Sequence, residues 1–469
     1  MIDIKNLTIS SAHNSLKNKD FTVLELVEAY LEVISKRNDS VNAYLEIYKN
    51  IKEQAAKAQK MFEDGSATML TGIPIAVKDN ILIKGEHASS SSKILEGYTC
   101  VYDATIIKKL KEECPVFLGR TNMDEFAMGS STQTSAYGVT RNPLDESLVP
   151  GGSSGGPAAA VAMDGALIAL GSETCGSIRQ PAAFCGLVGL EPTYGAVSRY
   201  GLMSLASSLD QISPIGKSVE DVEILYKSIS FYDKEDSTSI TQEKRIVDRP
   251  YGKRIGVPES CFNPDLDKEV AASFKASLEL LKNAGYEIVT LPMKFEKYAL
   301  AVYYVVMPAE SSTNLARFDG IRYGMRKEGN SLFETYSHSR GLGFGREVRR
   351  RALLGTYVLS TMSNGAYAKA LKVRAAITQE IFDAFTKVDF IVSPTAPMQP
   401  FKLGEKLTDP VAMYLSDVFS APANLSGCPS IALPTVKFSS GLPGSLQVTA
   451  PHWCEEHLFT FGKEFKKLL

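Results

Sequence analysis

Residues 150–181 read PGGSSGGPAAAVAMDGALIALGSETCGSIRQP, and this stretch decides the fold class of the chain. Gly, Ser and Ala crowd together in it, yet two apolar segments, residues 158–163 and residues 166–170, lie inside. A flexible linker rich in Gly and Ser carries no such segments. We therefore predict a buried helix, with Pro157 in its first turn, followed by a buried strand. The small residues beside these elements permit a close approach of the backbone.

Outward from this stretch, helix and strand signals alternate along the chain, which is typical of an α/β fold. Thr22 and Glu25 form a capping box, and apolar residues recur at helical spacing after them. Helices are predicted over residues 22–37, 50–62, 105–113 with Asp103 as the cap, 267–284, 347–385 with a break near residues 364–365, and from Glu455 onward. Strands are predicted within residues 72–80, 116–119, 254–257, 286–292, 389–393, 430–436 and 445–449.

The composition is that of a folded globular protein. Of 469 residues, 44% are hydrophobic and 22% are charged, so a large buried core is feasible. This length suits two or three average domains, or one large α/β sheet. The formal net charge of −2 provides no basic field over the whole chain. A nucleic acid, if one is involved, is therefore expected to be held mainly by a partner.

Cysteine usage and the absence of long apolar runs favour a reducing, aqueous compartment. The seven cysteines are an odd number without C-x-x-C spacing, which indicates neither a disulfide framework nor a zinc site. Residues 1–18 lack a basic start followed by an apolar run, and no stretch reaches about 18 uninterrupted apolar residues. We expect a cytoplasmic protein with no membrane contact and no bound metal.

Two common interpretations of the Gly-rich stretch fail on their context. Residues 151–155 fit the G-x-S-x-G pattern of a nucleophile elbow centred on Ser153, but no apolar strand runs into them. The five histidines lie in polar or terminal contexts, where a surface or packing role is expected. A phosphate-binding loop is excluded because no Gly-Lys-Ser/Thr follows and Pro157 stands where a lysine is needed. What remains is a serine activated by a base other than histidine.

Lys78 is the candidate base because it ends an apolar strand, and burial among neutral groups moves a lysine pKa toward neutrality. Spacing alone, however, favours a solvated lysine at a strand end. Ser177 has the better local context, since it lies between a buried strand and a helical turn, where backbone N–H groups can converge on an oxyanion. The oxyanion hole predicted from this loop uses the backbone of Thr174, Cys175, Gly176 and Ser177.

These motifs resemble those of the amidase signature family. The resemblance rests on G-G-S-S-G-G from Gly151, G-S-x-T-x-G-S-I-R-x-P from Gly171 and P-I-A-V-K-D-N from Pro74. Within that family the chain looks most like the A subunits of glutamyl-tRNA(Gln)/aspartyl-tRNA(Asn) amidotransferases. Segments that begin at Asp103, Thr121, Pro181, Ser198, Ser207, Leu354 and Met413 extend the match over nearly the whole chain.

The resemblance implies a fold and a catalytic triad. The fold is one α/β domain over residues 1–469, with a mixed twisted central sheet covered by helices on both faces. Helices in about residues 1–65 pack on a catalytic core of about residues 66–230, and the remainder completes the sheet and the substrate pocket. Ser177 is then the nucleophile, Lys78 the base, and Ser153, on an unusual cis peptide bond, the proton relay between them.

The implied activity is glutamine hydrolysis that supplies ammonia to a carbon–nitrogen ligase. Ser177 attacks the side-chain amide, ammonia leaves, and water releases glutamate from the acyl-enzyme. A partner B subunit uses ATP and Mg²⁺ to activate the carboxylate of Glu-tRNA(Gln), Asp-tRNA(Asn) or both, and it binds most of the tRNA. A small C subunit joins the two in a heterotrimer. This chain itself is expected to need no cofactor.

Glutamine carries an α-carboxylate and an α-ammonium, and both stay charged while they are partly desolvated. The resemblance assigns Arg351 to the carboxylate and Asp417 to the ammonium. Tyr304 is the third expected contact, with neighbouring Tyr303 as the alternative register. For the rest of the basic run at residues 349–351, a solvated helix face is the simpler interpretation.

Several positions depart from the family pattern, and they keep two other functions open. The departures are Gln133 for Glu, Pro157 for Ser, Glu173 for Asp, Cys175 for Gly and Glu191 for Lys. Cys175 lies in the predicted oxyanion loop, where a glycine with positive φ would be hard to replace. The alternatives are a stand-alone amidase for small amides, which needs neither Arg351 nor Asp417, and a partner-binding scaffold with impaired chemistry.

Overall fold

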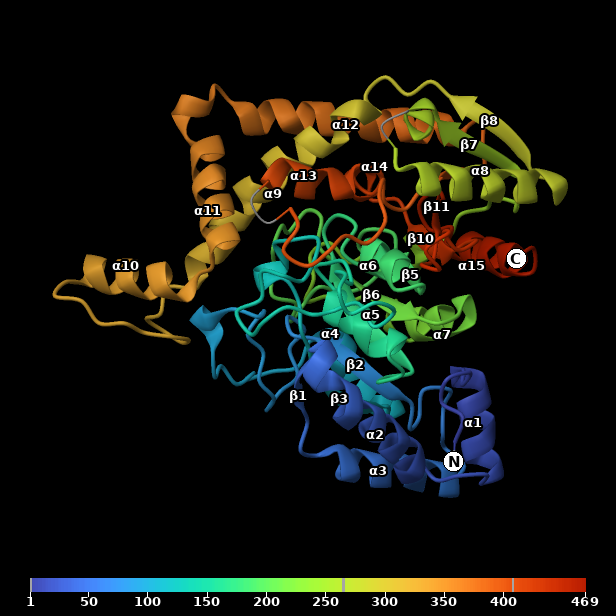
Figure 1. The fold of residues 1–469 in the computed structure, drawn as a ribbon. Helices are drawn as coiled ribbons and strands as arrows, with labels where there is room; N and C mark the ends of the chain where they lie inside the picture. The colour runs from blue at the N-terminus through green and yellow to red at the C-terminus, as the bar shows by residue number, and fades with distance from the viewer. Residues whose placement is uncertain (1, 264–265, 407–408) are drawn as a thin grey trace.

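A single mixed sheet organises the computed structural model, which describes residues 2–263, 266–406 and 409–469. Within these ranges eleven strands follow the order β1-β3-β2-β4-β6-β5-β10-β11-β9-β7-β8, from the bottom to the top of Figure 1. They are β1 (Tyr44–Ile47), β2 (Pro74–Lys78), β3 (Val116–Thr121), β4 (Ile168–Glu173), β5 (Val188–Glu191), β6 (Gln211–Gly216), β7 (Arg254–Pro258), β8 (Glu287–Leu291), β9 (Phe390–Pro394), β10 (Ser430–Pro434) and β11 (Ser445–Thr449). The predicted α/β class with a mixed sheet is confirmed.

The sheet consists of two parallel blocks joined by an antiparallel centre, with β1 added antiparallel to β3 at one edge. Strand β2 pairs in parallel with β3 and β4, and β7 pairs in parallel with β8 and β9. The strands between these blocks run antiparallel to their neighbours. Every residue of β2 and β4 is buried, which explains why both segments read as apolar runs rather than as alternating patterns.

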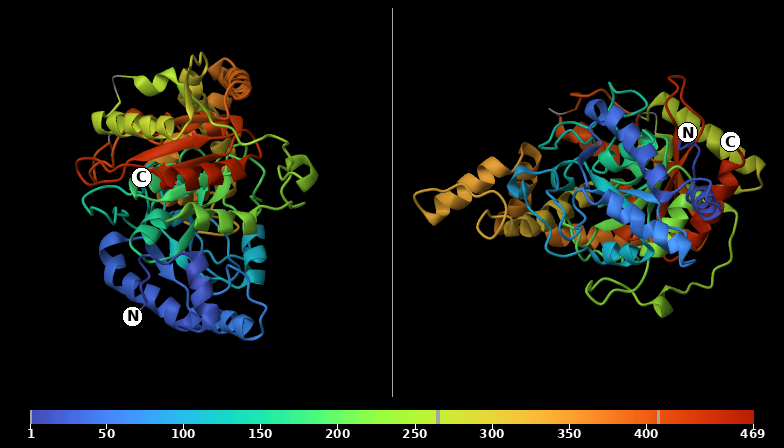
Figure 2. Two further views of the ribbon diagram at one scale, coloured as in Figure 1. Left: turned by 90° about the vertical axis from the view of Figure 1, so that its right-hand side faces the viewer. Right: turned by 90° about the horizontal axis from the view of Figure 1, so that it is seen from below.

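Helices cover both faces of this sheet (Figure 2). For example, α5 packs on β2 and β4, α7 on β6, and α8 on β9 and β11. The helices of the described residues are α1 (Ile9–Asn18), α2 (Val23–Val41), α3 (Ile51–Glu63), α4 (Thr105–Glu113), α5 (Gly155–Ala162), α6 (Arg179–Phe184), α7 (Val219–Ile229), α8 (Lys268–Asn283), α9 (Ala299–Asn314), α10 (Leu332–Gly343), α11 (Arg346–Leu359), α12 (Ala366–Phe385), α13 (Pro410–Tyr414), α14 (Ala421–Ser426) and α15 (Glu455–Lys466).

The helix-start signals were mostly correct, with one error. Thr22 and Glu25 form the predicted capping box at the start of α2. The predicted break at residues 364–365 separates α11 from α12, and both of those residues have positive φ. Asp103 does not cap α4, because the helix begins two residues later and the N-cap position falls on Ala104. The Asp103 carboxylate instead accepts from the Lys84 N–H and pairs with Lys111.

Two apolar cores meet next to the loop between β4 and α6. The larger core surrounds the sheet and includes Ile178, whereas the second lies under α9, α11 and α12 and includes Cys175. The residues between these two side chains, Gly176 and Ser177, therefore lie where the cores meet. Such a loop is held from both sides by packed elements, which fixes its backbone.

Helix α10 projects from the body of the molecule, as the views from the front and from below both show (Figures 1 and 2). Three large apolar side chains on it are exposed: Leu332 at 66%, Phe333 at 81% and Leu342 at 61%. None of the helices in the described part of the chain is long and apolar enough to cross a membrane.

Candidate active site

Lys78, the last residue of β2, is fully buried, so the solvated lysine that spacing alone favoured is not what the structure shows. Its Nζ lies 2.8 Å from Ser153 Oγ, 2.7 Å from Ser154 Oγ and 3.0 Å from the Ser172 carbonyl oxygen. Burial lowers the pKa of Lys78 to about 7, although the carboxylates of nearby acidic residues act in the opposite direction. A large fraction of Lys78 is therefore a neutral amine at neutral pH.

Counting hydrogens around this amine shows which serine can pass a proton to it. Ser154 Oγ donates its own hydrogen to the Ser172 carbonyl at 2.9 Å, so it can only accept from Lys78. The Ser172 carbonyl is an acceptor as well. A neutral amine has two N–H groups, which these two oxygens occupy, and its lone pair then faces the Ser153 hydroxyl. Ser153 is the serine that can give its proton to Lys78.

Ser154 was not among the site residues predicted from the sequence. It orients Lys78 through the contact described above, and it also receives the hydrogen bond of the Ser172 N–H at 3.3 Å. The only sequence signal for it is the second serine of the Gly151–Gly156 stretch. The Gly152–Ser153 peptide bond is cis, as the resemblance to the amidase signature family led us to expect.

Ser177 lies between β4 and α6 and is 6% exposed. Its carbonyl accepts from the Ser154 N–H at 3.1 Å, which ties the predicted nucleophile loop to the segment that carries the relay serine. Among the described residues, the Ser177 hydroxyl makes no hydrogen bond. Catalytic hydrogen bonds are often long in ligand-free sites and tighten when substrate binds.

The Glu173 carboxylate shapes the loop around Ser177. It accepts from the N–H groups of Gly176 at 2.8 Å, Ile178 at 2.8 Å and Arg179 at 3.1 Å. Of the four predicted oxyanion-hole residues, Gly176 thus has its N–H already engaged. In the part of the chain that the structure describes, no hydrogen bond takes up the N–H groups of the other three, Thr174, Cys175 and Ser177.

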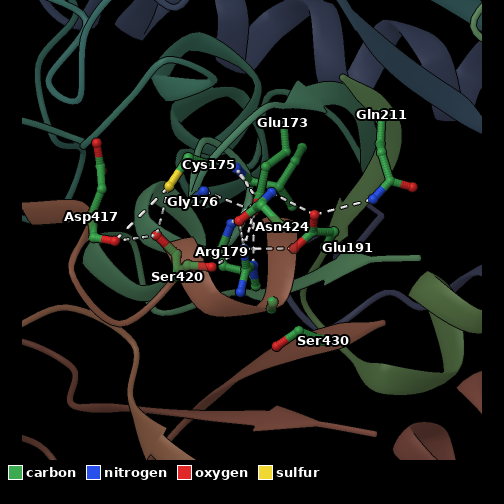
Figure 3. A network of polar contacts seen from close by, with 12 residues as sticks. Glu173, Cys175, Gly176, Arg179, Glu191, Gln211, Asp417, Ser420, Asn424 and Ser430 are labelled. Carbon is green, nitrogen blue, oxygen red and sulfur yellow. Dashed lines mark hydrogen bonds and ion pairs between the residues drawn. The ribbon is translucent and has the colours of Figure 1, made fainter. Parts of the chain in front are cut away.

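The cysteine in this loop does not force an unfavourable backbone. Positive φ occurs at Gly176, at 75°, and not at Cys175. The Cys175 side chain is 2% exposed, and its Sγ lies 3.6 Å from Ser420 Oγ and 3.9 Å from the Asp417 carbonyl oxygen (Figure 3). Burial raises the pKa of this thiol well above its usual value. The replacement of glycine at position 175 is therefore compatible with the loop.

The three residues predicted to bind glutamine lie together, although they come from three elements. Tyr304 is on α9, Arg351 is on α11, and Asp417 follows α13. The Tyr304 hydroxyl donates to Asp417 Oδ2 at 2.9 Å, and the Arg351 guanidinium lies 5.6 Å from the centre of the Tyr304 ring. This contact assigns the register to Tyr304, whereas Tyr303 packs edge-on against its ring.

Opposite charges are buried in this pocket, where water does not screen them. Arg351 and Asp417 are each 3% exposed. Burial raises the pKa of Asp417 to about 7, while the Tyr304 hydroxyl, Arg351 and Ser130 favour the ionised form. A bound ammonium group would add a positive charge beside Asp417 and lower that pKa. The pocket thus combines one guanidinium with one carboxyl group whose ionisation a bound ammonium group would favour.

Three further residues complete the pocket and were not predicted from the sequence. The Tyr414 ring stacks on Tyr304 at a centroid distance of 3.9 Å. Glu347 Oε1 accepts from Arg351 Nε at 2.8 Å, one helical turn away on α11. Ser130 Oγ lies 3.2 Å from both Asp417 carboxylate oxygens. Only Glu347 had a sequence signal, namely its i, i+4 spacing to the arginine.

Comparisons with known proteins agree with these motifs. The family model described as Amidase matches residues 25–459. The glutamyl-tRNA(Gln) amidotransferase A subunit of Desulfatibacillum aliphaticivorans is 46% identical, covering 99% of this chain and 97% of that protein. The corresponding A subunit of Koribacter versatilis is 48% identical, covering 97% and 96%. The crystal structure of the Thermotoga maritima A subunit has a TM-score of 0.80 at 39% identity, covering 98% of this chain and 94% of that one.

Proposed function

This chain belongs to the amidase family, and from that premise we propose that it is the glutamine-hydrolysing subunit of a tRNA-dependent amidotransferase. Relatives of 46% and 48% identity, matched over almost their full length, are named as the A subunits of glutamyl-tRNA(Gln) amidotransferases. The observation that carries the choice of glutamine is the buried Arg351 guanidinium and the buried Asp417 carboxyl group, which both contact Tyr304. Asp417 is also in contact with Cys175 of the nucleophile loop. A free amino acid carries the two complementary charges, and a simple amide carries neither.

In the proposed reaction, neutral Lys78 accepts the Ser153 proton while Ser153 accepts the proton of Ser177. The Ser177 oxygen attacks the side-chain amide carbon, and the developing oxyanion faces the free N–H groups of the loop. Lys78 then returns its proton through Ser153 to the leaving nitrogen, so that ammonia departs and the acyl-enzyme remains. Water attacks the acyl-enzyme by the same proton path, releases glutamate and restores the Ser177 hydroxyl.

The same proposal places the second half of the reaction on partner subunits. A B subunit would use ATP and Mg²⁺ to activate the carboxylate of Glu-tRNA(Gln), Asp-tRNA(Asn) or both, and a C subunit would complete the heterotrimer. The net charge of −2 supports the assignment of tRNA binding to a partner. The exposed apolar residues of α10 support a protein partner, because such side chains gain most from burial. In this proposal the chain uses only its own side chains and backbone N–H groups and needs no cofactor for its part.

The test separates glutamine hydrolysis from simple amide hydrolysis. We expect Arg351→Met to lower kcat/KM for glutamine by roughly 10- to 150-fold, since a hydrogen bond to a charged group contributes about 1.5–3 kcal/mol. Turnover of butyramide, which has no α-carboxylate, is expected to change little. Arg349→Met, on the exposed side of the same helix, is the matched control.

Ammonia release should be measured for the chain alone and for its complex with the B and C subunits. If robust butyramide turnover occurs alone and the complex hydrolyses no glutamine, the chain is a stand-alone amidase and the proposal is wrong. If neither substrate is hydrolysed, the scaffold alternative is favoured. The Lys78–Ser153 contact at 2.8 Å argues against that scaffold, because the base already contacts the proposed relay serine.

A further inference from the structure

Arg179 lies between two buried glutamates directly behind the nucleophile loop (Figure 3). Glu173 ends β4 and Glu191 ends β5, and all three side chains are fully buried. Arg179 Nη2 bonds to Glu173 Oε1 and lies 2.6 Å from Glu191 Oε2. Both glutamates occupy positions where the family pattern predicts other residues, so the two departures meet at one guanidinium.

A count of hydrogens shows that this cluster lacks a donor. Arg179 Nη2 has two hydrogens, but it faces oxygen atoms of Glu173, Glu191, Asn424 and Ser420. Glu191 Oε2 is buried and has no hydrogen bond within the described residues. A buried acceptor that lacks a donor is costly. A proton on Glu191 Oε2 would supply the missing donor.

The charges around the cluster also favour a proton on one of the two glutamates. Arg179 is one cation facing two carboxyl groups, and two carboxylates on one cation would leave a net negative charge in a dry interior. The other titratable groups that interact with the pair are Lys78, the Cys175 thiol and the Asp417 carboxyl beside Glu173, and the Cys428 thiol beside Glu191. Of these only Lys78 can carry a positive charge, and it is engaged with the serines of the active site.

We propose that Glu191 is protonated in the folded protein at neutral pH, and that this neutral acid is a positioning residue for the nucleophile loop. Its Oε1 accepts from Gln211 Nε2 at 3.1 Å and from Asn424. Its Oε2 donates to the Glu173 carboxylate, and the charge of Arg179 is left to Glu173. Glu173 can then stay ionised and hold the N–H groups of Gly176 and Ile178.

The pKa shifts of the two glutamates agree with a neutral Glu191 and an ionised Glu173. Burial, the largest influence, raises the pKa of Glu191 well above its usual value; the positive charge of Arg179 opposes this effect, and the negative charge of Glu173 adds to it. Burial also disfavours ionised Glu173, but Arg179 and the backbone N–H groups outweigh it and lower the pKa of Glu173. If Glu191 ionised, it would compete for Arg179 and loosen the hold of Glu173 on the loop.

The decisive experiment compares the pH dependence of unfolding in wild type and Glu191→Gln, which mimics the neutral acid. An unfolded glutamate ionises near pH 4.3, so above that pH the folded wild type binds one more proton than the unfolded chain. Through Glu191, rising pH then favours unfolding of the wild type but not of the variant, and the ratio of the two cancels the groups that both proteins share. The ratio of unfolding constants, wild type over variant, is expected to rise about tenfold per pH unit between about pH 5.5 and 7.5.

A constant ratio would overturn the proposal, because it would mean that Glu191 is already ionised in the folded state. Glu28→Gln, at an exposed position of α2, is the matched control and is expected to give a constant ratio against wild type. Glu191→Met is a second neutral variant and is expected to show the same slope as Glu191→Gln. Failure of both neutral variants to fold would also overturn the proposal.

The positioning role rests on the proposed glutaminase function, and the pH profile of glutamine hydrolysis tests it. Wild-type kcat is expected to fall on the alkaline side as Glu191 ionises, whereas Glu191→Gln retains kcat within about threefold at neutral pH and lacks this decline. A loss above tenfold in well-folded Glu191→Gln would refute the positioning role. Absence of glutamine hydrolysis in wild type would refute the proposed function instead, and the unfolding experiment would still decide the protonation of Glu191.

Discussion

Replacement of Ser154 by alanine is expected to shift the pH at which this enzyme becomes active. Ser154 Oγ accepts a hydrogen bond from Lys78 Nζ at 2.7 Å inside a fully buried cluster. This bond stabilises the charged lysine more than the neutral amine, since hydrogen bonds from ionised donors are about twice as strong as neutral ones. Without this hydrogen bond, the charged lysine loses more stabilisation than the neutral amine does, and the pKa of Lys78 falls further below its ordinary value.

The size of the shift follows from the two bond strengths. A hydrogen bond to a charged group contributes about 1.5–3 kcal/mol and a neutral one about 0.5–1.5 kcal/mol. The difference is about 1–1.5 kcal/mol, and one pKa unit corresponds to about 1.36 kcal/mol. From its starting value of about 7, the pKa of Lys78 is therefore expected to fall by about one unit in Ser154→Ala.

The assay is ammonia release from saturating glutamine between about pH 5 and 9, because kcat reports the pKa values of the substrate complex. A general base must be neutral to act, so activity rises with pH through the Lys78 pKa. In Ser154→Ala this rise should occur about one pH unit lower. Ser153→Ala, which removes the relay, should instead lower the plateau by about 10²–10⁴. An unchanged or more alkaline rise in Ser154→Ala would refute the reasoning.

Three other variants or treatments test separate parts of the structure. Tyr304→Phe removes the hydroxyl that donates to Asp417, and it should raise KM for glutamine by roughly 5- to 30-fold with little change in kcat, as steady-state kinetics can show. Cys175, buried and with a raised pKa, should resist iodoacetamide in the folded protein and react after denaturation, as mass spectrometry can show; rapid labelling of folded protein would contradict the site geometry. Phe333→Asp on α10 should leave the melting temperature unchanged and weaken binding to the partner subunits, measured by calorimetry; unchanged affinity would exclude α10 from the interface.

The local elements of this fold could be predicted because their causes are local. The apolar run before Lys78 and the stretch before Ser177 are strands that are buried over their whole length. The Thr22–Glu25 capping box acts over three residues, and the sequence alone locates it. The Asp103 error has another origin: the helix begins at Thr105, as predicted, but the N-cap is the residue directly before it, Ala104, so the capping residue and not the helix boundary was wrong.

The chemistry of the site depended on contacts between distant segments. The family motifs identified Lys78, Ser153 and Ser177. They did not show that Ser154 and the Ser172 carbonyl take up the two N–H groups of neutral Lys78, so that its lone pair faces Ser153. That selection follows from where the hydrogens can go, which requires the three-dimensional positions of all acceptors.

The sequence by itself determined the α/β class, the two serine-rich segments and the lysine, because strand burial and motif spacing are written in consecutive residues. Only the tertiary structure decided that Tyr304, Arg351 and Asp417 form one pocket, and that two unexpected glutamates meet at Arg179. These groups are brought together by the packing of separate helices and strands. Their charges and pKa values depend on burial and on neighbours that no local pattern encodes.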